Sequence, residues 1–466
     1  MLHRFVVVFL AGLTLLSAAP VSDPRLAGAF REPAKNGWTF VHLEGDPYRI
    51  GFQNGFLLSA EIAEFQKVVA LELSHDTKKP WSFFRATAEK DLWPLIEQEY
   101  RDELRGIAEG VQAEGVKLDL WDIVVLNAWL ELGYYNTWYD KQQGQTSKAV
   151  VPERCSAFVA TGSYTKDGKV VIAHNAWTGY MDGRFWTIVY DIVPTRGHRI
   201  LMDGLPGLIH SGDDFGLNSA GIAITETTIS NFAGWDPKGI PEFVRARKAM
   251  QYSQSIDDFI RIMSERNNGG YANNWLVADR KTNEICSLEL GLKNVNALRS
   301  FDGYFCGANF PVNQKLLHEE TEFPAGDISV SGNARKKRWE QLMAENKSKI
   351  DVAAAQRFMS DHFDTYQGKV EPNERTLCGH IDQSPRGLVS WQPPYGIAGA
   401  VQSKVADAGM MERMSFAGSA GHACGTDFKA SDHLAQHPEF AWQKEYLRDL
   451  KSQPWTTFSI AKDRQP

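Results

Sequence analysis

The chain has 466 residues, of which 43% are hydrophobic and 23% are charged, a composition ordinary for a globular protein that buries a substantial core. Its formal net charge is −7, which argues against a general nucleic-acid-binding protein because such a protein needs a basic face. One large domain and two smaller domains both fit this length.

Residues 1–22 have the pattern of an export signal. Arg4 supplies a short basic region, residues 5–16 are apolar, and small residues follow at positions 17–19. The apolar run is shorter than the ~20 residues that a membrane-spanning helix needs. Pro20 leaves the cleavage position open, and a retained signal anchor is the alternative. We therefore predict a secreted protein, or one in the periplasm or a lysosome-like lumen, where the compartment is oxidising.

Residues 23–154 are predicted to form a mostly helical N-terminal segment. Apolar residues recur at helical spacing in 54–73 and 89–115, and residues 120–140 are strongly apolar and aromatic. The polar stretch at 140–154 has the composition of an exposed linker. We interpret the segment as a propeptide-like region that ends in a cleavable linker.

The pattern changes at Cys155 to short β-rich runs separated by turns. Asp167-Gly168 is a hairpin turn between the first two of these runs. Helical patterns intervene at 241–266 and 333–362. This order predicts an α+β domain over residues 155–466, with layered antiparallel sheets and helices on the outside.

The cysteines are odd in number, so at least one thiol stays outside any intramolecular disulfide. They are Cys155, Cys286, Cys306, Cys378 and Cys424. A bridge from Cys286 to Cys306, which flank a predicted hairpin, and a second from Cys378 to Cys424 would leave Cys155 free. Four cysteines allow three pairings, so this pairing is a hypothesis. The spacings lack the close pairs of zinc sites, such as C-x2-C, and we predict no metal ion and no cofactor.

Cys155 alone supports two interpretations. A lone cysteine in a strand is usually a small buried hydrophobic residue. This one, however, lies where the linker meets the first strand. If the chain is cut between Arg154 and Cys155, the new N-terminus carries a thiol and an α-amine whose pKa near ~8 lets it act as a base around neutral pH. Nucleophile and base then share one residue, as in N-terminal threonine nucleophiles.

Several sequence blocks resemble the phospholipase B-like (lamina ancestor) family, which belongs to the N-terminal nucleophile hydrolases. The blocks are residues 155–180, 211–231, 269–279 and, more weakly, 403–421. The chain is also similar, more distantly, to acid ceramidase and the penicillin acyltransferases. The resemblance implies a four-layer αββα sandwich with Cys155 at the end of a central strand. It further implies autocatalytic cleavage between Arg154 and Cys155, after which the two fragments stay associated.

Three residues after the nucleophile are further candidates for the site, the first of them through the resemblance. His174 matches a histidine-containing block and is expected to handle protons, with a hydrogen-bonded structural histidine as the alternative. Trp177 is expected either to wall the pocket or to fill the core. Glu226 lies in a run with the pattern of a buried strand, where an unpaired charge is costly. It should therefore pair with the new amine of Cys155 or with an arginine, and a purely structural ion pair is the alternative.

The asparagine that the resemblance places beside the nucleophile falls at Asn273. Its side-chain NH2 group is implied to donate to the oxyanion of the tetrahedral intermediate, an interaction worth about 3 kcal/mol in a comparable hydrolase. The neighbouring Asn274 points to the opposite face if this stretch is a strand, and the assignment is open between these two positions.

Together these features predict an exported, self-processing hydrolase that uses an N-terminal Cys155 to cleave an acyl ester or a linear amide. The substrate would be a phospholipid, a lysolipid or an N-acyl amide. The alternatives are an acyltransferase of the penicillin acyltransferase type and a catalytically silent secreted binding protein on the same scaffold. A papain-like protease is disfavoured because its local signature around the cysteine is absent. Expected partners are the small substrate and, transiently, a membrane surface, but no nucleic acid.

Overall fold

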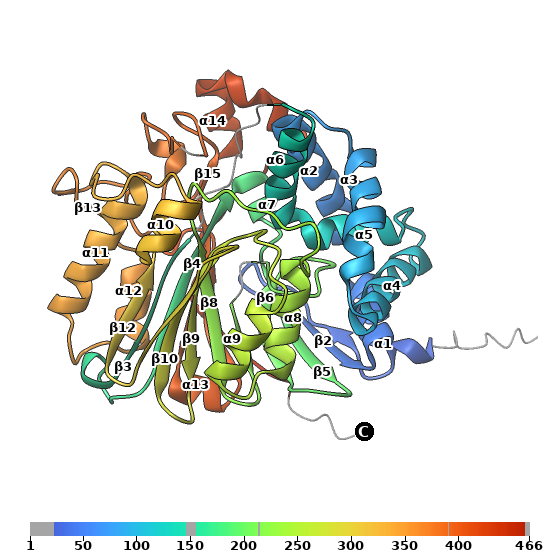
Figure 1. Cartoon of the computed structure of the whole chain (residues 1–466), viewed down its shortest axis with the longest axis horizontal. Coiled ribbons are helices and arrows are strands. Elements are labelled where there is room, and N and C mark those ends of the chain that lie inside the picture. The colour runs from blue at the N-terminus through green and yellow to red at the C-terminus, as the bar shows by residue number, and fades with distance from the viewer. Residues whose placement is uncertain (1–22, 146–154, 213–214, 390, 462–466) are drawn as a thin grey trace, which may run out of the picture.

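Two β-sheets packed face to face form the centre of the structure, a computed structural model that describes residues 23–145, 155–212, 215–389 and 391–461 (Figure 1). The larger sheet has nine strands, in the order β1-β2-β5-β6-β7-β8-β9-β10-β11, and the smaller has six, in the order β12-β3-β4-β15-β16-β17. The larger sheet consists of β1 (Phe30–Arg31), β2 (Thr39–Gly45), β5 (Ile188–Pro194), β6 (Ile200–Gly204), β7 (Gly216–Asn218), β8 (Ile222–Thr228), β9 (Asn273–Asp279), β10 (Glu284–Leu290) and β11 (Val295–Ser300). The smaller consists of β12 (Gly303–Gly307), β3 (Ser156–Thr161), β4 (Val171–Gly179), β15 (Ala398–Asp407), β16 (Ser415–Ala420) and β17 (Thr456–Ser459).

Helices cover the outer face of each sheet. Helices α8 (Glu242–Tyr252) and α9 (Ile256–Ser264) pack on the larger sheet, and α11 (Ser331–Glu345) and α12 (Val352–Met359) pack on the smaller (Figure 1). Side-chain alternation explains the layers: in β9, Trp275 contacts Phe259 of α9, whereas Leu276 belongs to the apolar core between the sheets. The predicted α+β class with an αββα sandwich is confirmed.

In the described residues before Cys155, six α-helices pack together beside the larger sheet (Figure 1). They are α1 (Pro47–Leu57), α2 (Ser59–Thr77), α3 (Trp81–Thr87), α4 (Gln98–Ala113), α5 (Leu120–Ala128) and α6 (Leu132–Gln142). Helices α1 and α4 approach closely through Gly51, Gly55, Gly106 and Gly110, where an added Cβ would meet a backbone oxygen at 1.9 to 2.2 Å. Strand β2 from the same part of the chain pairs in parallel with β5, so this segment also contributes to the larger sheet.

The remaining short elements lie mostly in connections between the layers. They are α7 (Tyr180–Gly183), α10 (Gln314–Glu320), β13 (Phe363–Asp364), β14 (Lys369–Val370), α13 (Ala408–Glu412) and α14 (Ala430–Gln436). In the described part of the chain, no helix combines the length and the hydropathy needed to cross a bilayer. The predicted signal peptide at residues 1–22 and residues 146–154 of the predicted linker lie outside the described residues, whereas α6 continues into the start of that linker, to Gln142.

The predicted disulfide between Cys286 and Cys306 is wrong, because both thiols are free. Cys286 lies on β10 of the larger sheet and packs into the core under the helices that cover it. Cys306 lies on β12 of the smaller sheet and packs toward α11 and α12 on the opposite outer face. The two side chains therefore lie on opposite outer faces of the sandwich, with both sheets between them. Cys378 and Cys424 are also free thiols, although they lie close together.

Candidate active site

Cys155 lies directly before β3, at the edge of the core, and its side chain is fully buried. Its φ of +81° lies in the left-handed region, which is costly for any residue other than glycine. Arg335 of α11 holds this position by donating from Nη1 to the Cys155 carbonyl oxygen at 2.6 Å and to Ser156 Oγ at 3.1 Å. The backbone at the candidate nucleophile is therefore strained and fixed from the neighbouring helix layer.

Three of the residues predicted from the sequence meet at this point. Cys155 Sγ, a ring nitrogen of His174 and a carboxylate oxygen of Glu226 all lie within 4.8 Å of one another, and all three side chains are fully buried. His174 comes from β4, which pairs with β3, whereas Glu226 comes from β8 of the other sheet. A thiol, an imidazole and a carboxylate in this arrangement contain the groups that activate a nucleophile and orient its base.

Glu226 receives hydrogen bonds from two residues of the following strand region. Tyr271 donates its hydroxyl to Oε1 at 3.0 Å. Asn273, with its amide nitrogen turned toward the carboxylate, donates to Oε2 at 2.9 Å. These partners of Glu226 are a phenol and an amide, and not the amine of Cys155 or the arginine that was expected. Asn273 is beside the site, and in this state its NH2 group is directed at the carboxylate.

Two residues predicted to line the site point elsewhere. Trp177 lies on the face of β4 opposite to His174, donates from Nε1 to Leu377 O at 3.3 Å, and packs 4.2 Å from the Arg335 guanidinium. Asn274 lies on the opposite face of β9 from Asn273, and its Oδ1 accepts from Ser287 Oγ at 2.7 Å. Strand alternation gives the reason in both cases, since neighbouring residues face opposite sides of a sheet. Trp177 therefore fills an apolar cluster of the core, which is one of the two roles expected for it.

Tyr271 and Arg335 were not predicted from the sequence, although the sequence contains a signal for each of them. Tyr271 belongs to the block at 269–279 but was not singled out. Arg335 is one of four consecutive basic residues of α11, and only helical spacing distinguishes it from the others. Ser331, Arg335 and Trp339 follow at intervals of four residues, and all three are buried on one face of α11.

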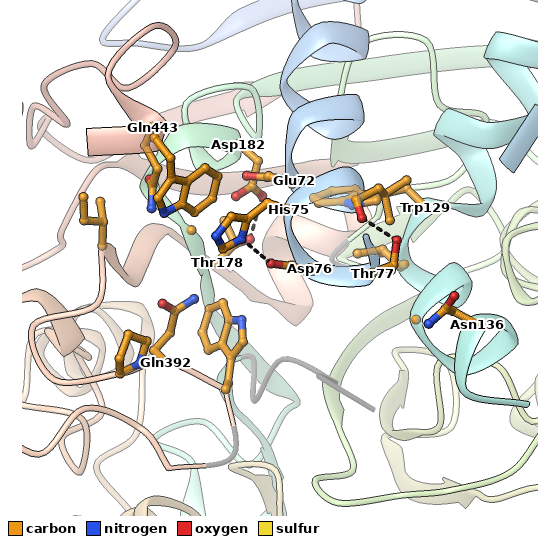
Figure 2. Close-up of a pocket in the computed structure, with 18 of the residues that line it drawn as sticks. Glu72, His75, Asp76, Thr77, Trp129, Asn136, Thr178, Asp182, Gln392 and Gln443 are labelled. Carbon is orange, nitrogen blue, oxygen red and sulfur yellow. Dashed lines mark hydrogen bonds and ion pairs between the residues drawn. The ribbon is translucent and has the colours of Figure 1, made fainter. Parts of the chain in front are cut away.

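A cavity of about 480 Å³ lies next to this group of residues, and Figure 2 shows side chains that line it. Tyr271 connects the two, because it lines the cavity and also donates to Glu226. Thr178 and Gly179, at the end of the strand that carries His174, line it as well. The opposite walls come from α2 and α6 before Cys155, from loop residues 391–397, and from residues 439–443 of a short 3-10 helix near the end of the chain.

The cavity is aromatic and acidic. Its aromatic walls include Trp129, Tyr134, Trp391, Phe440 and Trp442. The lining residues that the structure describes also carry four carboxylates and no lysine or arginine; the carboxylates are Glu72, Asp76, Asp182 and Glu439. His75 stacks on Trp442 with 3.8 Å between ring centroids and lies 2.9 Å from Asp76. Such a lining suits an amphipathic molecule whose polar part is neutral or cationic.

Comparisons with known proteins place this chain among named relatives. A family model described as Phospholipase B matches residues 77–293, which contain Cys155, His174, Glu226 and Asn273. A protein of Archaeoglobus fulgidus named only as an uncharacterized protein is 28% identical over 253 residues, which are 50% of this chain and 40% of that protein. Putative phospholipase B-like 2 of Caenorhabditis elegans is 24% identical over 287 residues, which are 53% of this chain and 48% of that protein.

Putative phospholipase B-like 2 of Homo sapiens is 30% identical over 145 residues, 27% of this chain and 24% of that protein. The matched parts thus span less than half the length of these relatives. A solved structure of a variant of conjugated bile acid hydrolase from Clostridium perfringens aligns with a TM-score of 0.34 and 10% identity, over 66% of this chain and 99% of that chain. The family match and the named relatives confirm that this chain resembles the phospholipase B-like family.

Proposed function

We propose that the protein is a self-processing hydrolase with Cys155 as its N-terminal nucleophile. The observation that carries this proposal is the convergence of the Cys155 thiol, the His174 imidazole and the Glu226 carboxylate within 4.8 Å, directly before a central strand. Relatives named as putative phospholipase B-like proteins support a hydrolase acting on acyl bonds.

Processing begins with attack of the Cys155 thiol on the carbonyl carbon of Arg154. The C–N bond breaks, the nitrogen takes up the thiol proton to become the α-amine of Cys155, and a thioester joins the Arg154 carbonyl to Sγ. Water then hydrolyses the thioester and leaves a carboxylate on Arg154. The positive φ of Cys155 supports this step, because strain at the scissile bond is released on cleavage.

The mature site would use the same thiol on substrate. The α-amine takes the thiol proton, and the thiolate attacks the acyl carbon of an ester or amide. The leaving alcohol or amine departs with that proton, and water hydrolyses the thioester. In this proposal His174 would hydrogen-bond to the Cys155 thiol, and Glu226 would hold either the imidazole or the new ammonium group. Asn273 becomes an oxyanion donor if its NH2 group turns from Glu226 toward the acyl oxygen.

The cavity favours an N-acyl amide, or an ester with a neutral or cationic leaving group, over an anionic phospholipid. The described lining of the cavity contains four carboxylates and no lysine or arginine, which disfavours a phosphate, whereas the aromatic walls accept an acyl chain or an alkylated ammonium group. An acyltransferase in which an amine replaces water, and a catalytically silent binding protein, are the other candidates. We further propose that the protein is exported by residues 1–22 and reaches lipid substrates by transient contact with a membrane surface.

Processing and turnover can be tested in one series. N-terminal sequencing of the fragments of the purified protein should find Cys155 as a first residue, and Cys155→Ala should remain one chain. Cys306→Ala, which removes a partly buried thiol elsewhere, should process normally. Substrate preference can be ranked by the rate of hydrolysis of a set of N-acyl amides and a lysophospholipid. The amides share one acyl chain and differ in whether the leaving group is neutral, cationic or anionic. Wild type that stays unprocessed and turns over none of these compounds would support the silent binding protein. Faster hydrolysis of the anionic compounds would overturn the substrate preference.

A further inference from the structure

Four side chains that commonly bind metals converge on the outer side of the smaller sheet. His362 follows α12, Cys378 and His380 lie in the loop after β14, and Cys424 lies in the turn after β16. One ligand atom from each lies within 4.8 Å of the others. Cys378 and His380 are fully buried, and the other two are partly buried. We propose that these four residues bind one zinc ion in a closed, structural site, which is independent of the proposed hydrolase activity.

The measured distances agree with tetrahedral zinc. His380 Nε2 lies 3.6 Å from Cys378 Sγ and 3.5 Å from Cys424 Sγ. With Zn–S near 2.3 Å and Zn–N near 2.0–2.1 Å, two ligands of a tetrahedral zinc ion lie about 3.6 Å apart when one is sulfur and the other nitrogen. The Cys378 and Cys424 thiols therefore already lie at the distances from the His380 imidazole that a shared zinc ion requires.

His362 supplies the fourth ligand. Its Nε2 atom is buried, yet no hydrogen-bond partner reaches it within the described ranges of the chain. Its ring lies 5.0 Å from the ring of His380, centroid to centroid. A buried imidazole nitrogen without a partner is costly, and a metal ion in the adjacent cluster would satisfy it.

Backbone contacts bring the ligand segments together before any metal binds. Cys378 N donates to Asp361 O at 3.1 Å, next to His362. Ser360 Oγ donates to Ala423 O at 2.9 Å, next to Cys424. The loop that carries Cys378 and His380 is thus fastened to the segment after α12, which is fastened in turn to the turn after β16. The site is preorganised, as a structural metal site requires.

The surroundings of His380 match those of a metal-bound histidine. Its second nitrogen, Nδ1, lies 3.2 Å from the Gln383 side-chain amide and 3.9 Å from Asp382 Oδ1. Histidines that bind a metal usually donate the other ring N–H to such a group, which fixes the tautomer. With the Gln383 oxygen turned toward the ring, Nδ1 donates to it and the Nε2 lone pair faces the two thiols.

The neighbouring His422 is not a fifth ligand, although its ring stacks on His380 at 4.1 Å. Its Nδ1 lies 2.8 Å from Thr426 O, and its Nε2 lies 2.9 Å from the Tyr180 hydroxyl. Tyr180 also donates to Asp382 at 2.8 Å. His422, Tyr180 and Asp382 therefore form a hydrogen-bonded network beside the four ligands. Two thiolates and two imidazoles complete a tetrahedral shell, so the site keeps no open position for substrate.

The site would fasten loops that back the strand carrying His174. Asn175 and Trp177 of β4 both donate to Leu377 O, the residue before Cys378, at 2.8 and 3.3 Å. Trp177 packs with Cys378, Ile381 and Leu388 in one apolar cluster. A zinc ion would hold this cluster against β4 from the face opposite to the nucleophile. The competing arrangement is a Cys378–Cys424 disulfide, which the same proximity allows.

The metal content of the full chain tests the proposal. After purification from zinc-containing medium and extensive buffer exchange, multi-element mass spectrometry should find about one zinc per chain in the wild type and in Cys306→Ser. Cys378→Ser/Cys424→Ser should retain less than about one tenth of that amount. Cobalt substitution of the wild type should give thiolate-to-cobalt charge-transfer absorption, which needs no variant to fold. A strong chelator should lower the Tm of the wild type.

Two outcomes in the wild type would overturn the proposal. One is a zinc-free wild type in which peptide mapping without reductant finds Cys378 linked to Cys424. The other is a zinc-free, fully reduced wild type that fails to take zinc from a chelator of about micromolar affinity, since structural sites bind far more tightly. Full zinc occupancy in the double variant would place the ion elsewhere and would equally contradict the assignment.

Discussion

Arg335 anchors the backbone of the proposed nucleophile, and its replacement tests how far α11 supports the site. The guanidinium is fully buried and donates to four oxygen atoms. These are Cys155 O at 2.6 Å, Ser156 Oγ at 3.1 Å, Asn309 Oδ1 at 2.9 Å and Ser331 Oγ at 3.0 Å. Arg335→Met keeps most of the apolar stem and removes all four donors.

The magnitude follows from these contacts. A hydrogen bond from a charged donor contributes about 1.5–3 kcal/mol, and a buried acceptor that loses its donor adds a desolvation cost. The two serine hydroxyls can rotate to other groups, whereas the Cys155 carbonyl and the Asn309 amide oxygen are held in place. We therefore expect Arg335→Met to lower the free energy of unfolding by about 3–5 kcal/mol. Cleavage before Cys155 should also slow, because the attacking residue loses its anchor.

Urea unfolding should be measured in the Cys155→Ala background, where the chain stays in one piece and a two-state analysis is meaningful. Lys336→Met on the same helix is the control. That side chain is about half exposed and pairs with Glu340, so its loss should change stability by less than about 0.5 kcal/mol. An Arg335→Met chain that unfolds within about 1 kcal/mol of its parent and, with Cys155 restored, processes at the parental rate would refute the anchoring role.

Three further changes test other parts of the structure. Tyr271→Phe removes the donor to Glu226 but keeps the aromatic wall, so kcat should fall roughly tenfold with little change in KM; an unchanged kcat would contradict this. Gly106→Ala places a Cβ 2.1 Å from a carbonyl oxygen of α1 and should cost about 1–3 kcal/mol in urea unfolding, whereas an unchanged midpoint would contradict the close helix contact. Burial raises the pKa of the Cys286 and Cys306 thiols to about 12. Since only the thiolate reacts, iodoacetamide at pH 8 should leave both unmodified until urea is added, and equally fast labelling of the native protein would contradict this.

Local patterns predicted the elements around the nucleophile. The turn at Asp167-Gly168 does join β3 and β4 as an antiparallel hairpin, and its register sets Ala157 opposite His174. Turn chemistry and side-chain alternation are properties of neighbouring residues, so they can be read from the sequence. The same alternation puts Asn273 and Asn274 on opposite faces of β9. It also predicts that Trp177 and His174 lie on opposite faces of β4.

Contacts between distant segments could not be predicted in this way. The pairing of β2 with β5, the separation of Cys286 from Cys306 by two sheets, and the approach of Arg335 to Cys155 all depend on tertiary packing. The proposed zinc ligands illustrate the same limit. Zinc motifs are recognised when ligands come in close pairs, but here three segments each contribute part of the set, and only Cys378 and His380 are near neighbours in sequence.

The segment before Cys155 is built into the fold, and we therefore expect it to stay after cleavage. Strand β2 lies between β1 and β5, and its Val41 and Leu43 side chains are fully buried. Each such side chain stabilises the folded state by about 1.5–3 kcal/mol, and the helices from α1 to α6 add many more. Residues from both fragments line the cavity, for example Trp129 before the cleavage position and Trp391 after it. The two fragments should thus co-elute in native size-exclusion chromatography and separate only in denaturant. Active enzyme that had lost the first fragment would show that the cavity is not the substrate site, because half of its wall would be gone.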